Sequence, residues 1–199
     1  DMNSPIISLD TPSAKAYAVE DQRNQEIPLF ALVCTPGLPV RLDIIQKLRR
    51  ERHTGLMQLI SWRVSFWPPI NQETIVVIYE RPLGGSLIDA LKTDSFEITE
   101  YDIQATIIEP IFQTIRELSA KNIPHRGIRV ENIFFQDKER KEIVLGDCIT
   151  CPPAFNQPII YEPVQRAMAS PGGRGRGDLS DDLYALGVTI VISIFGKNV

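Results

Sequence analysis

The chain has 199 residues, of which 43% are hydrophobic and 23% charged, as in globular proteins that bury a core. The net charge of -4 argues against binding nucleic acid or anionic membranes through bulk charge. We find no segment with the form of a signal peptide. The longest apolar run, residues 183–195, is too short to span a bilayer and predicts a buried core helix. We therefore expect a cytoplasmic protein without a membrane span in this chain.

The three cysteines do not indicate a metal or redox site. Cys148 and Cys151 form a C-x-x-C pair, but the third cysteine and the two histidines are scattered along the chain. A redox pair of this type stands at the start of a helix, and Pro152 and Pro153 disfavour a helix there. We interpret both cysteines as incidental loop residues.

The first part of the chain is rich in strand signals. Short apolar and β-branched runs alternate with turns that contain proline or glycine. We expect strands at residues 5–10, 15–20, 27–34, 56–66 and 74–81. One amphipathic helix is expected at residues 39–51, because apolar residues recur there at helical spacing with basic residues between them.

A glycine turn at residues 84–85 separates this part from one rich in helix signals. We expect helices at residues 86–92, 99–122 and 181–195, and two short strands at residues 133–135 and 143–145. Residues 150–180 are loop-like, and we interpret their Gly/Arg-rich patch, residues 172–177, as a solvated linker. This order predicts an α+β fold in two lobes, residues 1–81 and 82–199.

Local signals mark the ends and one interruption of these helices. Ser86 is the expected N-cap of the short helix. Thr99 and Asp102 form a capping-box-like start of the long helix, with Asp in the position usually held by Glu. Pro110 inside the long helix predicts a kink or a local break, because proline has no backbone N–H to donate.

The stretch at residues 125–132, His-Arg-Gly-Ile-Arg-Val-Glu-Asn, resembles the protein kinase catalytic loop H-R-D-L-x-x-x-N. Four more segments resemble kinase segments in the correct order: the turn after the regulatory helix, the hinge, the D-F-G segment and the start of the central large-lobe helix. These segments are residues 52–56, 80–87, 145–149 and 181–188. The resemblance covers nearly the whole chain. It implies a bilobal kinase-like fold with a β-rich small lobe and a shortened, mainly helical large lobe.

Several departures from that family concern ATP chemistry. Gly127 stands where the family has the aspartate that accepts the proton of the substrate hydroxyl. The glycine-rich loop would fall near residues 10–18, yet the first glycine is Gly37. The third strand contains no lysine, and the next helix offers Asp43 or Ile44 in place of its glutamate partner. The A-P-E-like segment at residues 162–164 also lacks its final acid. We therefore expect no catalytic residue.

The resemblance also implies where a nucleotide and its metal would bind, if they bind at all. Tyr79 takes the gatekeeper position, and Glu80 and Pro82 lie in the adenine-facing hinge. Asn132 and Asp147 would be the magnesium ligands. In the interpretation that we favour, these two residues bond within the chain instead, and neither ATP nor metal is bound.

Three further residues have roles implied by the resemblance. Asp182 would anchor the catalytic loop from the central helix. Arg126, which in the family meets a phosphorylated activation loop, would here pair with a local acid or face solvent. Arg129 is a candidate substitute for the missing phosphate-binding cation, because its guanidinium group could approach a phosphate.

These features favour a pseudokinase without phosphotransfer activity, which binds a protein partner as a scaffold or an allosteric regulator in signalling. A second interpretation is a degenerate nucleotide-binding enzyme, with weak phosphoryl or nucleotidyl transfer and metal held by Asn132 and Asp147. A third is a dimerisation module that pairs with a second copy of itself.

Overall fold

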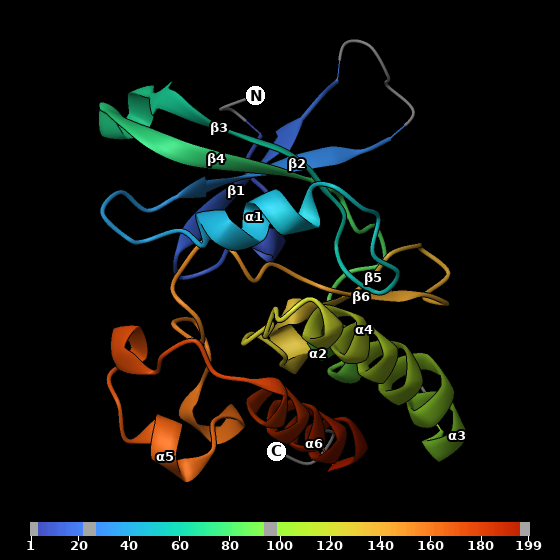
Figure 1. Cartoon of the computed structure of the whole chain (residues 1–199). Coiled ribbons are helices and arrows are strands. Elements are labelled where there is room, and N and C mark those ends of the chain that lie inside the picture. Colours follow the sequence, from blue (N-terminus) through green and yellow to red (C-terminus); the bar gives the residue numbers. More distant parts are fainter. Residues whose placement is uncertain (1–3, 22–26, 94–98, 196–199) are drawn as a thin grey trace. The chain divides into compact units, whose positions relative to one another are not determined.

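The structure is a computed structural model that describes residues 4–21, 27–93 and 99–195 (Figure 1). It has the mixed α and β content that the sequence predicts, and it divides into two compact units, which we describe separately. Unit 1 comprises Asp1–His53, Met57–Arg81 and Ile149–Pro152. Unit 2 comprises Thr54–Leu56, Pro82–Cys148 and Pro153–Val199.

Unit 1 is built on a four-stranded antiparallel sheet with the strand order β1-β2-β4-β3. The strands are β1 (Ala14–Val19), β2 (Leu29–Cys34), β3 (Leu59–Trp67) and β4 (Gln72–Glu80). All six residues of β2 are buried, as expected of an apolar central strand. Helix α1 (Leu42–Leu48) is shorter than predicted and buries Ile44, Ile45 and Leu48.

The strand predicted at residues 5–10 is wrong. Only Pro5 forms a bridge, to Tyr17 of β1, and Ile7–Leu9 is a 3₁₀-helix. Beyond it, the carboxylate of Asp10 accepts the backbone N–H of Ala16 at 2.8 Å. A side chain that takes a strand's N–H group competes with a further strand for the same donor, and this explains why the pairing stops.

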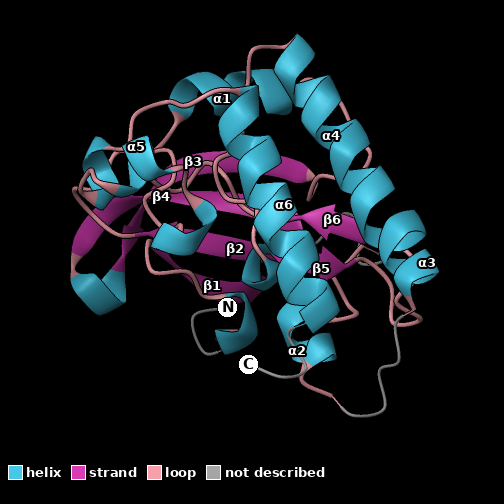
Figure 2. Cartoon of the chain, turned by 90° about the horizontal axis from the view of Figure 1, so that it is seen from below, coloured by secondary structure: helices cyan, strands magenta, loops and turns pink. Residues whose placement is uncertain are grey.

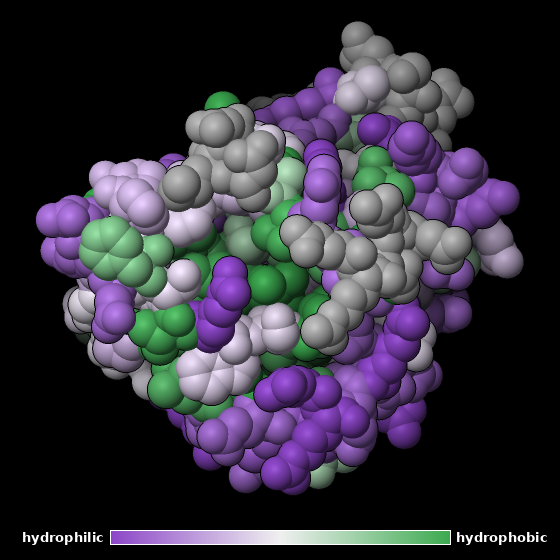
Figure 3. All heavy atoms as spheres, turned by 90° about the horizontal axis from the view of Figure 1, so that it is seen from above, coloured by the Kyte–Doolittle hydropathy of each residue, from purple (hydrophilic) through white to green (hydrophobic). Residues whose placement is uncertain are grey.

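A small apolar cluster lies on one face of this sheet. Its buried members are Ala31, Val33 and Val76, and the partly buried Tyr17 and Trp67 pack against it. The two aromatic rings are in contact, with centroids 4.9 Å apart. Figure 3 shows, from above, green apolar side chains gathered over the sheet between purple hydrophilic ones. Two rings thus shield small aliphatic residues on a face where several side chains remain partly exposed.

Unit 2 is mainly helical (Figure 2). Its helices are α2 (Leu87–Leu91), α3 (Glu100–Asp102), α4 (Glu109–Ala120), α5 (Val164–Ala167) and α6 (Leu179–Phe195). A π-helical stretch, Ile103–Ile108, joins α3 to α4. It ends just before Pro110, which has no N–H for the helical ladder, so the interruption predicted there is confirmed.

Both predicted helix starts are confirmed. The Ser86 hydroxyl accepts the backbone N–H of Asp89 at 3.2 Å. At the start of α3, the Thr99 hydroxyl accepts the N–H of Asp102 at 3.2 Å, and the Asp102 carboxylate accepts the N–H of Thr99 at 3.0 Å. The second pair is a reciprocal capping box, which satisfies two backbone donors that a helix start otherwise leaves unpaired.

The short hairpin of unit 2 matches the prediction. It consists of β5 (Ile133–Phe135) and β6 (Ile143–Leu145), both fully buried. The N–H of Leu145 donates to the carbonyl of Gly55 at 2.8 Å, which fixes β6 against the segment Thr54–Leu56. The hairpin therefore holds in place the residues that precede and follow it, which are those of the candidate site.

The interpretation of residues 172–177 as a solvated linker is wrong for one residue, Arg174. Its side chain is 4% exposed, although its neighbours in the patch are mostly open to solvent. The guanidinium group donates to the carbonyl oxygens of Ala154, at 2.9 Å, and Gln157. An arginine that is bonded twice to backbone ties the patch to the preceding loop.

Helix α6 is only partly the buried core helix that was predicted. Ala185, Leu186 and Thr189 are buried, whereas Val191 is 55% and Phe195 59% exposed. The helix therefore has one buried side and one apolar side in solvent. Within residues 4–21, 27–93 and 99–195, we find no helix with the length and apolar character to cross a membrane.

Candidate functional site

The loop at residues 125–132 follows α4 and is hydrogen-bonded to the first turn of α6. The N–H groups of His125 and Arg126 donate to the two carboxylate oxygens of Asp182, each at 2.7 Å. Asp182 is 2% exposed and lies in the first turn of α6. Arg126 has a φ of 62°, in the left-handed region, which costs a non-glycine residue about 1–3 kcal/mol. The anchoring role expected of Asp182 is confirmed, and its two charge-assisted bonds offset this strain.

Gly127 has no side chain, and it stands where the kinase catalytic loop has the aspartate that accepts a proton. A Cβ atom at this position would lie 3.2 Å from Nδ2 of Asn132 and 3.5 Å from the carbonyl oxygen of Asp147. Neither of these groups can accept the proton of a hydroxyl in the manner of a carboxylate. Gly127 itself has no side chain, so this position of the loop offers no carboxylate to accept the proton of a hydroxyl.

Asn132 is bonded within the chain. Its amide donates to the carbonyl oxygens of Gly127 at 2.8 Å and Asp147 at 2.9 Å, and the residue is 3% exposed. Its other amide atom, Oδ1, lies against Gly146, where an added Cβ atom would overlap it. The amide thus clamps two loops together, and the oxygen that would bind a metal faces backbone.

Asp147 is half-buried and differs from Asn132 in this respect. A metal site built from protein groups needs several oxygen, nitrogen or sulfur ligands around one point. Across the described part of the chain, no group of three or more histidine, cysteine or acidic side chains could hold a metal ion. Asp147 is therefore the one implied metal ligand whose side chain keeps partial access to solvent.

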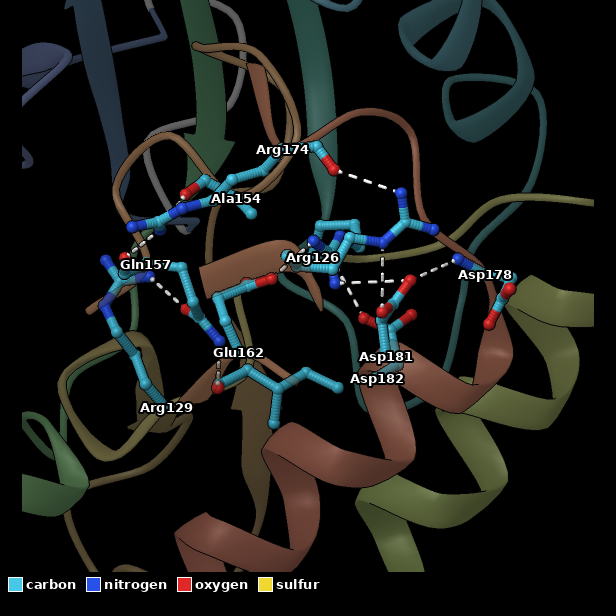
Figure 4. A network of polar contacts seen from close by, with 11 residues as sticks. Arg126, Arg129, Ala154, Gln157, Glu162, Arg174, Asp178, Asp181 and Asp182 are labelled. Carbon is cyan, nitrogen blue, oxygen red and sulfur yellow. Dashed lines mark hydrogen bonds and ion pairs between the residues drawn. The ribbon is translucent and has the colours of Figure 1, made fainter. Parts of the chain in front are cut away.

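Arg129 does not face a space in which a phosphate could lie. It is 8% exposed, and its guanidinium group donates to the carbonyl of Gly127 at 3.4 Å and to Oε1 of Gln157 at 3.3 Å. Gln157 in turn donates to the carbonyl of Ile128 at 2.8 Å. Arg129 and Gln157 therefore brace the loop from the following segment (Figure 4).

Arg126 forms the centre of a buried ion network (Figure 4). Its guanidinium group lies 2.6 Å from Glu162, and both side chains are 1% exposed. A second nitrogen of the group lies 3.5 Å from Asp181, which Arg166 also approaches at 3.4 Å. Of the two outcomes predicted for Arg126, a local acid or solvent, the structure has the first.

Glycine is required next to this network. Gly177 has a φ of 71°, and an added Cβ atom would lie 2.5 Å from the Arg126 side chain and 2.6 Å from Asp181. Both the backbone conformation and the space exclude a side chain here. The Gly/Arg-rich patch thus contributes Gly177 to the same assembly as Arg126.

Two of the residues predicted to lie around the adenine, Tyr79 and Glu80, belong to unit 1. Tyr79 is 3% exposed, and its ring stacks on Phe30 with centroids 5.7 Å apart. Glu80 pairs with Arg52 at 2.9 Å. Pro82, which belongs to unit 2, is buried. The side chains of Tyr79 and Glu80 are thus engaged inside unit 1.

The backbone of residues 80–84 has no free donor for an adenine. Pro82 has no N–H group, and the other four N–H groups each donate to a carbonyl of the chain. The pairs are Glu80 to Gln58 at 3.0 Å, Arg81 to Pro28 at 2.8 Å, Leu83 to Gln136 at 3.1 Å and Gly84 to Phe135 at 3.0 Å. Sequence reasoning missed this feature, because only Pro82 gives a sequence signal.

The turn in place of the glycine-rich loop is bonded to the chain's own segment. The N–H and C=O groups of Thr11 pair with those of Ala14. The Ser13 hydroxyl, which is fully buried, lies 3.1 Å from the Thr150 hydroxyl in the segment Ile149–Pro152. This turn presents no row of free N–H groups of the kind that cradles phosphate.

Comparisons with known proteins bear on the fold of the chain. No model of a known protein family matches the chain. The chain is 27% identical over 168 residues to a serine/threonine-protein kinase D of Synechocystis sp. (strain ATCC 27184 / PCC 6803 / Kazusa), with 78% of the chain covered. It spans 32% of that relative's length. A crystal structure of Rad53 in complex with AMP-PNP matches 97% of the chain with a TM-score of 0.72 and 14% identity, over 48% of the Rad53 chain.

The chain has a protein kinase-like fold. The order of a small antiparallel sheet, a helical part and an intervening hairpin is that of the fold implied by the sequence. Within the kinase-like fold, unit 2 brings Gly127, Asn132 and Asp147 together, as predicted. Gln157 and Glu162 were missed as partners of the loop, because each is separated from its partner by roughly 30 residues.

Proposed function

We propose that the chain is a pseudokinase domain, which keeps the kinase-like fold, does not transfer phosphate and acts by binding a protein partner as a scaffold or an allosteric regulator. The observation that carries this proposal is Gly127. It replaces the base, and the neighbouring Asn132 uses its amide to bond two backbone carbonyls. The loop keeps its anchoring by Asp182 and its shape without the groups that perform the reaction.

The energetic argument concerns the phosphoryl transfer step. Catalysis of this step depends on positioning and on electrostatic stabilisation of the transferring group. The loss of one such stabilising group costs about 3–4 kcal/mol of barrier in enzymes where it has been removed. Here Gly127 stands in the position of the base, β2 has no lysine of the kind that grips phosphate in the family, and Arg129 is buried against Gln157. Three such losses leave little rate enhancement.

Two segments of backbone, residues 80–84 and 11–13, support the proposal that neither ATP nor magnesium is bound. An adenine ring presents one acceptor and one donor at its edge, so it needs an N–H group as partner. Residues 80–84 have no N–H group without a carbonyl partner. The turn of residues 11–13 is bonded within unit 1 and offers no phosphate cradle. We therefore assign no cofactor to the domain.

An exposed apolar surface supports the binding part of the proposal. Ile159, Ile160, Val164 and Met168 lie within ten residues of one another in unit 2, and each is at least 61% exposed. An exposed apolar patch often marks a protein contact, and we propose that these four side chains form one. Light scattering over a concentration series tests whether the partner is a second copy of the chain. A homodimer requires the average mass to rise with concentration.

Thermal unfolding with ATP tests the proposal. A ligand that binds the folded state must raise the free energy of unfolding by mass action, by about 2.7 kcal/mol when its concentration is a hundred times Kd, and the melting temperature rises with it. We expect no rise with millimolar ATP that depends on magnesium or manganese. A rise that depends on the metal would contradict the proposal. A radiolabel transfer assay with a general protein substrate, beside an active kinase, provides the second readout.

A degenerate enzyme is the second candidate. It is favoured by the name of the Synechocystis relative, a serine/threonine-protein kinase, and by the partial exposure of Asp147. In this case metal and nucleotide would bind through Asp147, and transfer would be slow. The thermal experiment distinguishes the two candidates, because metal-dependent stabilisation that Asp147→Asn removes is expected for the second candidate alone.

A further inference from the structure

Unit 1 contains a pocket that the kinase-like fold does not explain. It has a volume of about 390 Å³ and lies at the C-terminal end of α1. Its lining residues are Gln46 of α1, Arg49 and Arg50 directly after the helix, and Trp62 of β3. This volume falls within the range of about 300–1,000 Å³ in which small-molecule sites are found.

The pocket is lined with hydrogen-bond donors. Its lining residues among those that the structure describes carry two guanidinium groups, one amide and one indole N–H, and none of them is an acid. Across the described residues, the side chains of Arg49 and Arg50 form no ion pair. Arg52, three residues beyond Arg49, is instead paired with Glu80. Two neighbouring unpaired cations repel each other, and an anion between them removes this cost.

Helix stability explains only part of the arrangement. Cations near the C-terminus of a helix are favourable by about 0.3–1 kcal/mol each, through interaction with the last carbonyls. Lys47 already supplies such a charge in the last turn of α1. An interaction between cations and the end of α1 requires neither a pocket nor a partly buried tryptophan on its opposite wall. Trp62 lies on the neighbouring strand β3 and is half-buried at the edge of the pocket.

We propose that this pocket binds a phosphate monoester. A dianionic phosphate has three acceptor oxygens, so it can use both guanidinium forks and the Gln46 amide. A carboxylate has two oxygens and one charge, which a single arginine already satisfies. The pocket is larger than a phosphate group, so the organic part of the ligand packs against the ring of Trp62. The proposal holds whether or not the domain transfers phosphate.

The sources of such a group are a phosphorylated side chain of a partner protein and a free small phosphate ester. The chain has two tryptophans, so Trp67→Phe leaves Trp62 as the reporter. Fluorescence of this variant is titrated at constant ionic strength with phenyl phosphate, inorganic phosphate and benzoate. A phosphotyrosine peptide and its unphosphorylated twin form the second pair of probes.

We expect saturable quenching by phenyl phosphate, with an affinity at least about tenfold higher than that for benzoate. The double variant Arg49→Gln/Arg50→Gln should weaken it at least about tenfold, a change of about 1.4 kcal/mol or more. Arg63→Gln is the matched control, because Arg63 follows Trp62 in β3 and points to the opposite face. It should change the affinity by less than about twofold. Circular dichroism checks that each variant is folded.

Three results would overturn the proposal: no saturation at about 10 mM phenyl phosphate, equal binding of benzoate, or equal binding by the double variant. Tighter binding of the phosphopeptide than of phenyl phosphate supports a protein source, and equal binding supports a small phosphate ester. The pocket can also bind the phosphates of ATP. A thermal shift by ATP that needs no metal and is lost in the double variant therefore belongs to this pocket, and it leaves the proposed function intact.

Discussion

Glu162→Gln tests the buried ion network of unit 2. The change keeps the shape of the side chain and removes the charge that Arg126 meets at 2.6 Å. Both side chains are 1% exposed, so little water can take over the role of the lost carboxylate. The guanidinium group retains Asp181 at 3.5 Å, and the variant should therefore fold but be less stable. The loss measures how strongly the pair holds the segment around Glu162 to the loop of Arg126.

The magnitude follows from Coulomb's law and from the burial. Two unit charges about 4 Å apart attract by about 4 kcal/mol at an effective dielectric constant near 20. Asp181 compensates part of the loss, and we expect the free energy of unfolding to fall by about 3 kcal/mol. Removing one partner of a buried pair elsewhere costs about 3–5 kcal/mol. For a chain of this length, such a loss lowers the melting temperature by roughly 6–12 °C.

Circular dichroism at the helix band is the suitable assay, because α4 and α6 both belong to unit 2. Tryptophan fluorescence follows unit 1 instead, since Trp62 and Trp67 lie in β3. Arg52→Gln is the matched control: it breaks an ion pair of 2.9 Å whose arginine side chain is 75% exposed. Exposed pairs contribute about 0–1 kcal/mol, so this variant should unfold close to the wild type.

A double-mutant cycle with Arg126→Met gives the coupling energy of the pair. If the ion pair stabilises unit 2, the double variant costs less than the sum of the single variants, by at least about 1 kcal/mol. Additive losses would refute the reasoning. A loss below about 1 kcal/mol for Glu162→Gln would refute it as well, because such a small effect is that of a solvated pair.

Gly177→Ala should lower the free energy of unfolding by at least about 2 kcal/mol, because the added methyl group overlaps Arg126 and φ is positive. A urea titration measures this loss. The control Gly172→Ala places its methyl group in open space and should cost under about 0.5 kcal/mol. Burial raises the pKa of Tyr161 from 10.0 to about 12, so the unfolded chain loses this proton first and stability falls between these pH values. Tyr161→Phe should flatten this decline in alkaline unfolding curves, whereas Tyr101→Phe, at an exposed site, should leave it unchanged. Gly127→Asp restores the base but should give no detectable phosphotransfer, because the hinge donors and the strand lysine are still missing; transfer by this variant would contradict the nucleotide-free site.

The features that the sequence predicts correctly have local causes. Thr99 and Asp102 cap a helix that they themselves begin. Pro110 interrupts its own helix, and the apolar residues of β2 predict a buried strand. Asp182 is an exception, because its role as anchor came from the likeness of residues 181–188 to the start of the central large-lobe helix, and its partners lie in a distant loop.

The features that the sequence does not predict depend on distant partners. Arg174 lies in a Gly/Arg-rich patch whose composition predicts solvent, yet it donates to the carbonyls of Ala154 and Gln157. Such a contact requires the fold, because 17 residues separate Arg174 from Gln157. The strand predicted at residues 5–10 fails for a related reason, since the Asp10 carboxylate takes an N–H of β1. Side-chain competition of this kind has no periodic signal.

The pairing of Arg126 with Glu162 bears on when the segment around Arg126 can become ordered. Glu162 is encoded in the chain, and its carboxylate is present as soon as the polypeptide is made. A phosphate in the same role would be added by one enzyme and removed by another, so order would follow the state of the cell. A carboxylate has no such cycle. The carboxylate that pairs with Arg126 is thus present from synthesis, and this contact does not depend on the addition of a phosphate.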